Sequence, residues 1–272
     1  IEGKEAELEV LSEKVLDRGM IQEGFEVIAS AIDGMIYFGR TLAVVDHQGF
    51  RERDFGRPVQ KPILSMPPKL ARVLVNLSGV RPGGVLLDPF CGIGTILAEA
   101  LMMKMDIRGV DIDARRVSET RLNLDWIVNR YHLLRNGLKE KVLQGDTRSL
   151  SSYLKEGSID GIATEPILLP PLRQHPSSKD ALKMLSNAEK VYSTALVEMA
   201  KVLKKSGRIA IVMPYVQTQE GDLLSFSVDA LLENVRLKPY RPRIATSWRY
   251  PLFAKAEGGQ KVIRGVYVLE KE

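Results

Sequence analysis

Short apolar runs recur along most of the chain, and segments with helical spacing of apolar residues separate them. Five runs with Val, Ile or Leu at their centres are typical of buried parallel strands. They are residues 85–87, 107–113, 141–146, 159–164 and 208–214. Strands that alternate with helices predict an α/β fold with a doubly wound, mostly parallel sheet.

The intervening segments predict the helices of this fold. A helix is expected over residues 68–77, because a proline is favoured in the first turn of a helix. Further helices are expected from residue 95, over 114–131, over 179–204 with a break near Ser186 and Asn187, and from residue 229. Residues 250–253 and 262–270 flank a glycine-containing turn at 257–259 and predict an antiparallel hairpin at the carboxyl end.

The first 60 residues follow a different pattern. Residues 4–18 predict a short amphipathic helix, and residues 25–32 and 35–45 predict a hairpin around Asp33 and Gly34. Residues 46–69 carry arginines among prolines and glycines, which is typical of a linker. We therefore expect an extension with its linker over residues 1–60 and the main domain over residues 61–272.

The composition limits the class of protein. The chain has 272 residues and 44% hydrophobic content, enough for a sizeable core, and no apolar run approaches the ~18 residues of a membrane span. Cys91 is the one cysteine, which excludes an internal disulfide and a cysteine zinc site and fits a reducing cytoplasm. The net charge of +5 and the pI near 9.2 suit a polyanionic partner, although the same charge also serves solubility.

The run at 85–87 leads into a glycine turn that predicts a nucleotide or cofactor site. Gly92 and Gly94 let the backbone approach a ligand, and the following helix offers free N–H groups at its amino end. Leu97 stands where a dinucleotide motif needs its third glycine, and the Gly-Lys-Ser/Thr of a P-loop is absent. Asp88 would repel a phosphate and suits a cation with an amino group, such as S-adenosylmethionine. An ordinary strand-to-helix turn is the alternative.

Acidic residues follow the next two strands at positions that nucleoside-binding sheets use. Asp111 lies about 20 residues past the glycine turn, where a carboxylate can accept hydrogen bonds from both ribose hydroxyls. Asp113 is the second choice for this role and could instead cap the next helix. Asp146 ends the third strand, where it could accept from an adenine amino group or cap a turn.

Residues 88–95, Asp-Pro-Phe-Cys-Gly-Ile-Gly-Thr, resemble the first motif of the RNA guanosine-N2 methyltransferases that often carry a THUMP domain, among them archaeal tRNA enzymes. Residues 66–77 are similar too, and the resemblance runs from about residue 38 to the end. It implies a class I, Rossmann-like methyltransferase that uses S-adenosylmethionine to methylate guanine N2 in tRNA. It also implies a cytoplasmic location and a small protein activator as a possible partner. The extension would then be a brace or a remnant of an RNA-binding module. The cofactor-binding residues so implied are Asp88, Pro89, Cys91, Gly92, Gly94, Thr95, Asp111, Ile112, Asp113, Asp146 and Thr147.

The transfer site of the resembled family is an Asp-Pro-Pro-Tyr motif after the fourth strand. Here the sequence reads Glu165-Pro166-Ile167-Leu168, which keeps an acid and a proline and lacks the aromatic ring. An exocyclic amine is a weak nucleophile, and a carboxylate that accepts its N–H assists methyl transfer. We therefore assign Glu165 and Pro166 as catalytic. The alternatives are transfer to another atom, including an amino group on another base of RNA or DNA, and a catalytically silent homologue that binds cofactor and RNA.

Residues 236–255 interleave cations and aromatic rings without an acid, a composition that suits a nucleic-acid surface. The expected RNA contacts are Arg241, Arg243, Trp248 and Arg249. The alternative for this segment is a solvated loop over buried aromatic residues. The arginines of residues 46–69 likewise belong either to a solvated linker or to a segment that contacts RNA. Cys91 lies inside the cofactor turn, so we expect a packing residue there and not a nucleophile. The three histidines are scattered, so no metal site is expected.

Overall fold

The computed structural model describes residues 27–60, 66–134, 137–166, 169, 172–233, 235–241, 249–254 and 261–272. The chain divides into two compact units, Ile1–Gly56 and Arg57–Glu272. The expected helix at 4–18 and the expected turn at 257–259 lie outside the described residues. The division into an extension over 1–60 and a domain over 61–272 stays a prediction.

The first unit contains a hairpin and a helix. Strands β1 (Val27–Ile32) and β2 (Met35–Arg40) pair antiparallel, with Asp33 and Gly34 at positive φ in the turn between them. Helix α3 (His47–Phe55) begins where the Asp46 carboxylate accepts a hydrogen bond from the Gly49 N–H at 2.8 Å. The expectation of a linker at 46–69 is wrong for residues 47–55. The helix has too few apolar residues for a periodic pattern, so its capping residue is the main local signal.

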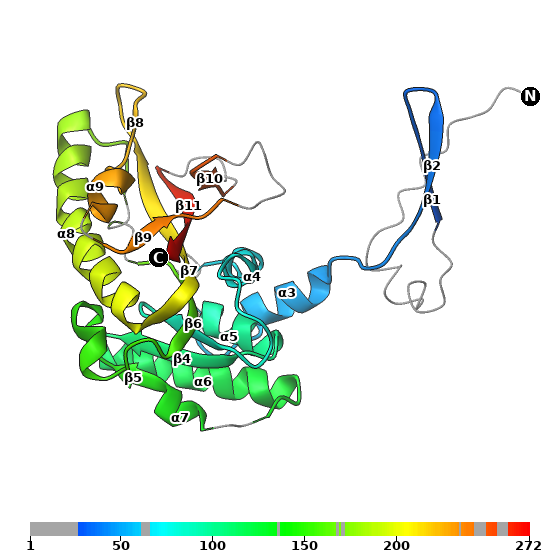
Figure 1. The fold of residues 1–272 in the computed structure, drawn as a ribbon, viewed down its shortest axis with the longest axis horizontal. Helices are drawn as coiled ribbons and strands as arrows, with labels where there is room; N and C mark the ends of the chain where they lie inside the picture. Colours follow the sequence, from blue (N-terminus) through cyan, green and yellow to red (C-terminus); the bar gives the residue numbers. More distant parts are fainter. Residues whose placement is uncertain are drawn as a thin grey trace, which may run out of the picture. The chain divides into compact units, whose positions relative to one another are not determined.

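The second unit is built on one sheet, which has nine strands within the described residues. Its order is β10-β11-β7-β6-β3-β4-β5, with β8 on β7 and β9 on β11 (Figure 1). The strands are β3 (Val85–Asp88), β4 (Asp106–Asp111), β5 (Val142–Gln144), β6 (Ile159–Thr164), β7 (Leu203–Gln217), β8 (Leu223–Leu224), β9 (Leu237–Pro239), β10 (Leu252–Phe253) and β11 (Val262–Lys271). Strands β5, β4, β3, β6 and β7 run parallel, while β11 and β10 add the expected antiparallel hairpin. The strand order reverses between β3 and β6, where α/β sheets bind ligands beyond the carboxyl ends of their strands.

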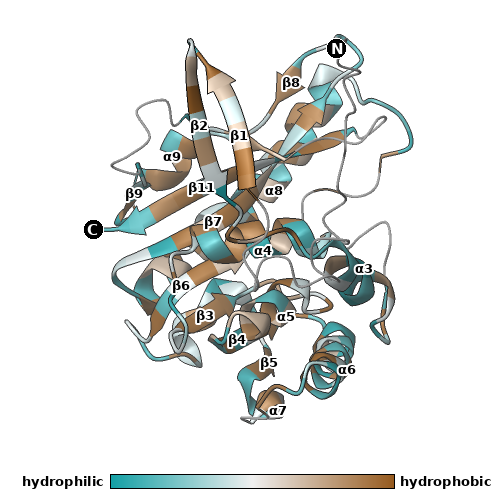
Figure 2. Cartoon of the chain, turned by 90° about the vertical axis from the view of Figure 1, so that its right-hand side faces the viewer, coloured by the Kyte–Doolittle hydropathy of each residue, from teal (hydrophilic) through white to brown (hydrophobic). Residues whose placement is uncertain are grey.

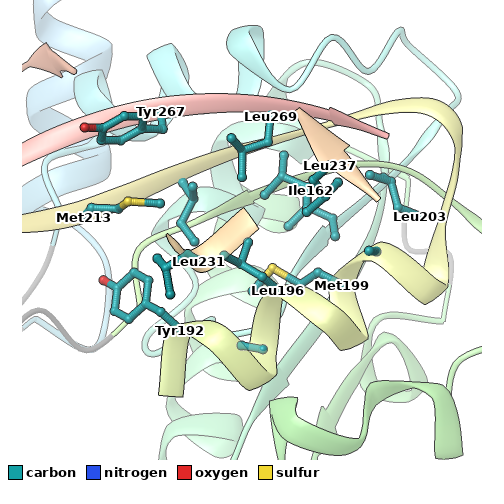
Figure 3. Packing of buried hydrophobic residues seen from close by; sticks show 14 of the residues in the cluster. Ile162, Tyr192, Leu196, Met199, Leu203, Met213, Leu231, Leu237, Tyr267 and Leu269 are labelled. Atoms are coloured by element: carbon teal, nitrogen blue, oxygen red, sulfur yellow. The ribbon is translucent and has the colours of Figure 1, made fainter. Parts of the chain in front are cut away.

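Helices cover both faces of this sheet. One buried cluster joins the sheet to α4 (Pro68–Leu77), α5 (Thr95–Met102) and α6 (Ala114–Arg130). The other joins it to α8 (Ser178–Val202) and α9 (Val228–Leu232), and Figure 3 shows Tyr192, Leu196 and Met199 of α8 facing the strands. Figure 2 shows the matching pattern, with hydrophobic stretches along β6 and β7 and mixed hydrophobic and hydrophilic positions on α6.

Three elements differ from the sequence expectations. Helix α8 runs without the break expected near Ser186 and Asn187, because the buried side chains of Leu185 and Tyr192 on either side hold it against the sheet. Strand β5 is shorter than expected and is preceded by a helical turn, α7 (Leu138–Lys141). Strand β7 is longer, because its carboxyl end pairs with β11 as far as Val216. Among the described residues, no helix has the length and apolar character needed to cross a membrane.

Candidate functional site

Asp88 and Thr164 meet where the strand order reverses. They end the neighbouring strands β3 and β6, and the Thr164 hydroxyl donates to Asp88 Oδ1 at 2.8 Å. The Phe90 N–H donates to the same oxygen at 3.2 Å. The pKa of Asp88 is raised from its ordinary 3.8 to about 7, mainly by burial. The nearby carboxylates of Asp111 and Glu165 also raise this pKa, whereas the hydrogen bonds from Thr164 and Phe90 lower it. The sheet thus gathers three acids at this edge.

The glycine turn after β3 is tied to the sheet and to α6. Gly92 and Gly94 have φ of +54° and +83°, in the left-handed region that favours glycine. A side chain at Gly94 would meet Thr120 Cγ2 at 2.8 Å, whereas the nearest atom at Gly92 is 3.9 Å away. The Thr120 hydroxyl donates to the Gly92 carbonyl at 2.7 Å, and Cys91 N–H donates to Val110 O at 3.0 Å. The turn is fixed in shape and open on the Gly92 side.

Asp111 at the end of β4 faces this turn. Its Oδ2 accepts from the Gly92 N–H at 2.9 Å, and its Oδ1 accepts from the Asp113 N–H at 3.0 Å. Ile112 is exposed between the two acids, and Asp113 caps α6 through the Arg115 N–H at 2.8 Å. The structure therefore brings Asp111 together with the glycine turn and gives Asp113 the capping position named as its alternative.

The segment after β5 also reaches the turn. The Thr147 hydroxyl donates to the Pro89 carbonyl at 2.5 Å, so Thr147 and Pro89 lie together. Asp146 caps the 3₁₀ helix η1 (Thr147–Ser152) and pairs with Arg148, whose hydrogen bonds lower the pKa of the Asp146 carboxyl. The capping role named as an alternative for Asp146 is present, and an adenine contact stays a prediction.

Arg57 and Val59 are bonded to the glycine turn and the helices that flank it, a contact that the sequence pattern does not predict. Arg57 is buried, and its Nη1 donates to Thr95 Oγ1 at 2.6 Å, at the first residue of α5. The buried Asn123 side chain of α6 accepts from the Val59 N–H at 2.9 Å and donates to the Val59 carbonyl at 3.1 Å. It also donates to the Ile93 carbonyl at 2.9 Å. Asn123 therefore clamps this segment and the glycine turn together; an asparagine inside an apolar helix face is the signal that could have identified it.

Glu165 follows β6, and its carboxylate is held by Arg264 of β11. Arg264 Nε and Nη2 donate to the two carboxylate oxygens, the second at 3.4 Å. Both side chains are largely buried, with 13% of Glu165 and 19% of Arg264 exposed. Pro166, the residue after Glu165, is buried, while Ile167 and Leu168 lie outside the described residues.

The expected RNA-contacting residues are described only in part. Arg241 and Arg249 are exposed, whereas Arg243 and Trp248 lie outside the described residues. Two aromatic rings of the same segment are engaged within the protein. The Arg208 guanidinium lies 3.7 Å from the Tyr240 ring centre, and Tyr250 stacks on Tyr267.

The Cys91 thiol is buried in the core cluster of α4, α5 and α6, and burial raises its pKa well above the ordinary value. Burial and a raised pKa are typical of a cysteine that packs in a core, and the packing role expected for Cys91 stays a prediction. Across the parts of the chain that the structure describes, no group of three or more His, Cys, Asp or Glu side chains is arranged to hold a metal ion.

The order of this sheet, with antiparallel β11 between β7 and β10 and a glycine turn at the point of reversal, is that of the class I methyltransferase fold. The model of the RMKL-like methyltransferase domain family (UPF0020) matches residues 57–221, and the chain belongs to this family.

Relatives support the same assignment. The chain is 36% identical over 180 residues to the tRNA (guanine(10)-N2)-dimethyltransferase of Methanothermobacter thermautotrophicus, covering 65% of this chain and 46% of that relative. It is 30% identical over 212 residues to the protein of the same name from Pyrococcus abyssi, covering 74% of this chain and 57% of that relative. The chain thus spans about half the length of these relatives. The solved structure of TrmN from Thermus thermophilus has the same fold, with a TM-score of 0.52 at 22% identity over 90% of this chain and 59% of that one.

Proposed function

We propose that this chain is an S-adenosylmethionine-dependent RNA methyltransferase that acts on N2 of guanine in tRNA. The observation that carries the proposal is the meeting of Asp88, Asp111 and Glu165 at the carboxyl edge of the sheet, beside the glycine turn. Three acids at one edge suit a ligand with positive charge and donor groups. The names of the two archaeal relatives supply the substrate, and a cytoplasmic location belongs to the same proposal.

The residues present fit the proposed cofactor. The open side of Gly92 leaves a cradle for close approach, and the first turn of α5 offers N–H groups to a carboxylate. Asp88 would hold the ammonium group, and Asp111, already oriented by two backbone N–H groups, would hold the ribose. Cys91, Gly94, Thr95, Ile112 and Asp113 would line this site, with Pro89, Asp146 and Thr147 on the adenine side. When bound, S-adenosylmethionine supplies a methyl group activated by its sulfonium.

Glu165 would act on the nucleophile. The exocyclic amine of guanine shares its lone pair with the ring and must become pyramidal to react. A carboxylate that accepts one amine N–H stabilises the positive charge that develops on the nitrogen, and it can take the proton afterwards. Pro166 would fix the backbone after Glu165. The RNA phosphates and a base ring would be contacted by Arg241, Arg243, Trp248 and Arg249. A small protein activator stays a prediction that rests on the resemblance.

The test is to incubate the protein with unmodified tRNA and methyl-labelled S-adenosylmethionine, then digest the RNA and identify the labelled nucleoside. We expect labelled N2-methylguanosine in the wild type and a large loss of label, to a slow residual rate, with Glu165→Gln, at unchanged affinity for S-adenosylhomocysteine. Glu156→Gln is the matched control, because Glu156 is an exposed acid just before the same strand.

The other outcomes would replace the proposal by one of its alternatives. A labelled methyl group on another nucleoside would indicate an amino-methyltransferase of different specificity. No label on tRNA, despite measurable cofactor binding, would indicate a silent homologue that binds cofactor and RNA.

A further inference from the structure

The transfer motif of this chain has a partner on a distant strand. Arg264 of β11 lies 99 residues from Glu165 in the sequence, and its guanidinium donates to both carboxylate oxygens. Arg264 sits opposite Pro214 in the register of β11 and β7, near the carboxyl end of β7. The antiparallel hairpin thus contributes a side chain to the edge where β3 and β6 present their acids.

The hydrogen bonds from Arg264 restrain the orientation of the Glu165 carboxylate. A glutamate carboxylate has one more rotatable bond than an aspartate and must lose more side-chain freedom to be fixed. An arginine fork with one N–H to each oxygen fixes both the direction and the plane of a carboxylate. Each carboxylate oxygen has two acceptor positions, so an oxygen bound by Arg264 can still accept from an amine.

We propose that Arg264 is a positioning residue that aims Glu165 at the substrate amine. The proposal rests on the proposed function, because it assumes that Glu165 accepts the amine hydrogen.

The test compares Arg264→Met and Arg264→Lys with Glu165→Gln and the double variant Glu165→Gln/Arg264→Met. Arg208→Met is the matched control, because Arg208 is a partly buried strand arginine that pairs with Glu270 across the same two strands. The measurements are kcat, KM for tRNA, affinity for S-adenosylhomocysteine, thermal unfolding, and crystal structures of the wild type and Arg264→Met.

We expect Arg264→Met to lower kcat about 10- to 100-fold, the usual effect of misplacing a reacting group by an ångström or less. Cofactor affinity and KM should stay unchanged, and Arg264→Lys should recover part of kcat. The double variant should be no slower than Glu165→Gln alone, because both changes act through one carboxylate. In the Arg264→Met crystal, Glu165 should leave its wild-type rotamer.

The contrary results are distinct. The positioning role would be overturned if Arg264→Met lowered kcat in the Glu165→Gln background by the same factor as in the wild type. It would also be overturned if Arg208→Met lowered kcat as much as Arg264→Met does. A wild type that binds cofactor and transfers no methyl group would refute the proposed function alone. The crystal comparison would then still decide the role of Arg264, because an unchanged Glu165 rotamer would contradict it.

Discussion

The Thr164 hydroxyl donates a hydrogen bond to the buried carboxylate of Asp88 at 2.8 Å and thereby joins β3 to β6 at their carboxyl ends. These residues are 76 positions apart, and the bond spans the place where the strand order reverses. Only 1% of Asp88 is exposed, so the protein keeps an acid in a position where burial opposes its charge. Acids with a pKa shifted by burial are more frequent at functional sites than elsewhere in a fold.

The first prediction concerns the pH dependence of stability. The pKa of Asp88 is raised from 3.8 to about 7 by burial, so the folded state binds this proton more tightly than the unfolded state. The stability that this proton contributes is complete below pH 4 and is lost as pH rises through about 7. The difference between the two pKa values corresponds to about 4 kcal/mol of unfolding free energy.

Asp88→Asn isolates this effect, because asparagine resembles the protonated acid and can accept from Thr164. Its unfolding free energy, measured by urea denaturation, should match that of the wild type at or below pH 4 and exceed it near pH 8. Identical pH profiles for the two proteins would show that Asp88 is ionised without cost in the folded state. The variant should also bind S-adenosylhomocysteine more weakly at pH 8.

The second prediction compares two glycines with nearly the same φ. Gly94 and Gly83 have φ of +83° and +84°, so alanine is strained at either, by about 1–2 kcal/mol. A Cβ at Gly94 would lie 2.8 Å from Thr120 Cγ2, whereas none of the surrounding atoms lies within 4 Å at Gly83. Gly94→Ala should therefore destabilise the fold by about 1–3 kcal/mol more than Gly83→Ala.

Cofactor binding separates the two variants further. Gly94→Ala should weaken S-adenosylhomocysteine binding because it displaces the turn, and Gly83→Ala should leave it unchanged. Equal effects on stability and on binding would mean that the turn relaxes without strain around the added methyl group. Thermal unfolding and calorimetric titration are the two measurements.

The third prediction concerns the core under α8. Leu196 is fully buried between α8 and the sheet (Figure 3). Its neighbour Val197 is 37% exposed. Leu196→Ala should lower the unfolding free energy by about 2–5 kcal/mol, because it removes apolar contacts and leaves a cavity. Val197→Ala, on the same helix, should cost less than about 1 kcal/mol. A similar loss in both would contradict the expectation, because it would mean that burial does not set the cost of truncation on this helix. Denaturant unfolding measures both.

The parts of the molecule that the sequence predicts are those set by local patterns. Apolar runs give the central strands because a buried parallel strand needs them, and Asp113 caps α6 where its position beside the helix predicts it. The glycine turn follows from two glycines that adopt positive φ. Arg264 could not be predicted as the partner of Glu165, because only the antiparallel placement of β11 beside β7 brings them together. Arg57 lies in the stretch whose composition predicts a linker, and its contact with Thr95 could not be predicted because it depends on the path of the folded chain.

The last prediction concerns the clamp formed by Asn123. Its buried side chain makes three hydrogen bonds, two to Val59 and one to the Ile93 carbonyl in the glycine turn. Asn123→Ala removes all three and leaves buried backbone groups without that partner, which should cost about 2–4 kcal/mol of unfolding free energy. Asn76→Ala is the control, because Asn76 is an exposed helix residue whose side chain donates to the Arg72 carbonyl. If the clamp shapes the cofactor turn, Asn123→Ala should also weaken S-adenosylhomocysteine binding at a temperature where the variant is fully folded. Unchanged binding there would restrict Asn123 to a role in stability.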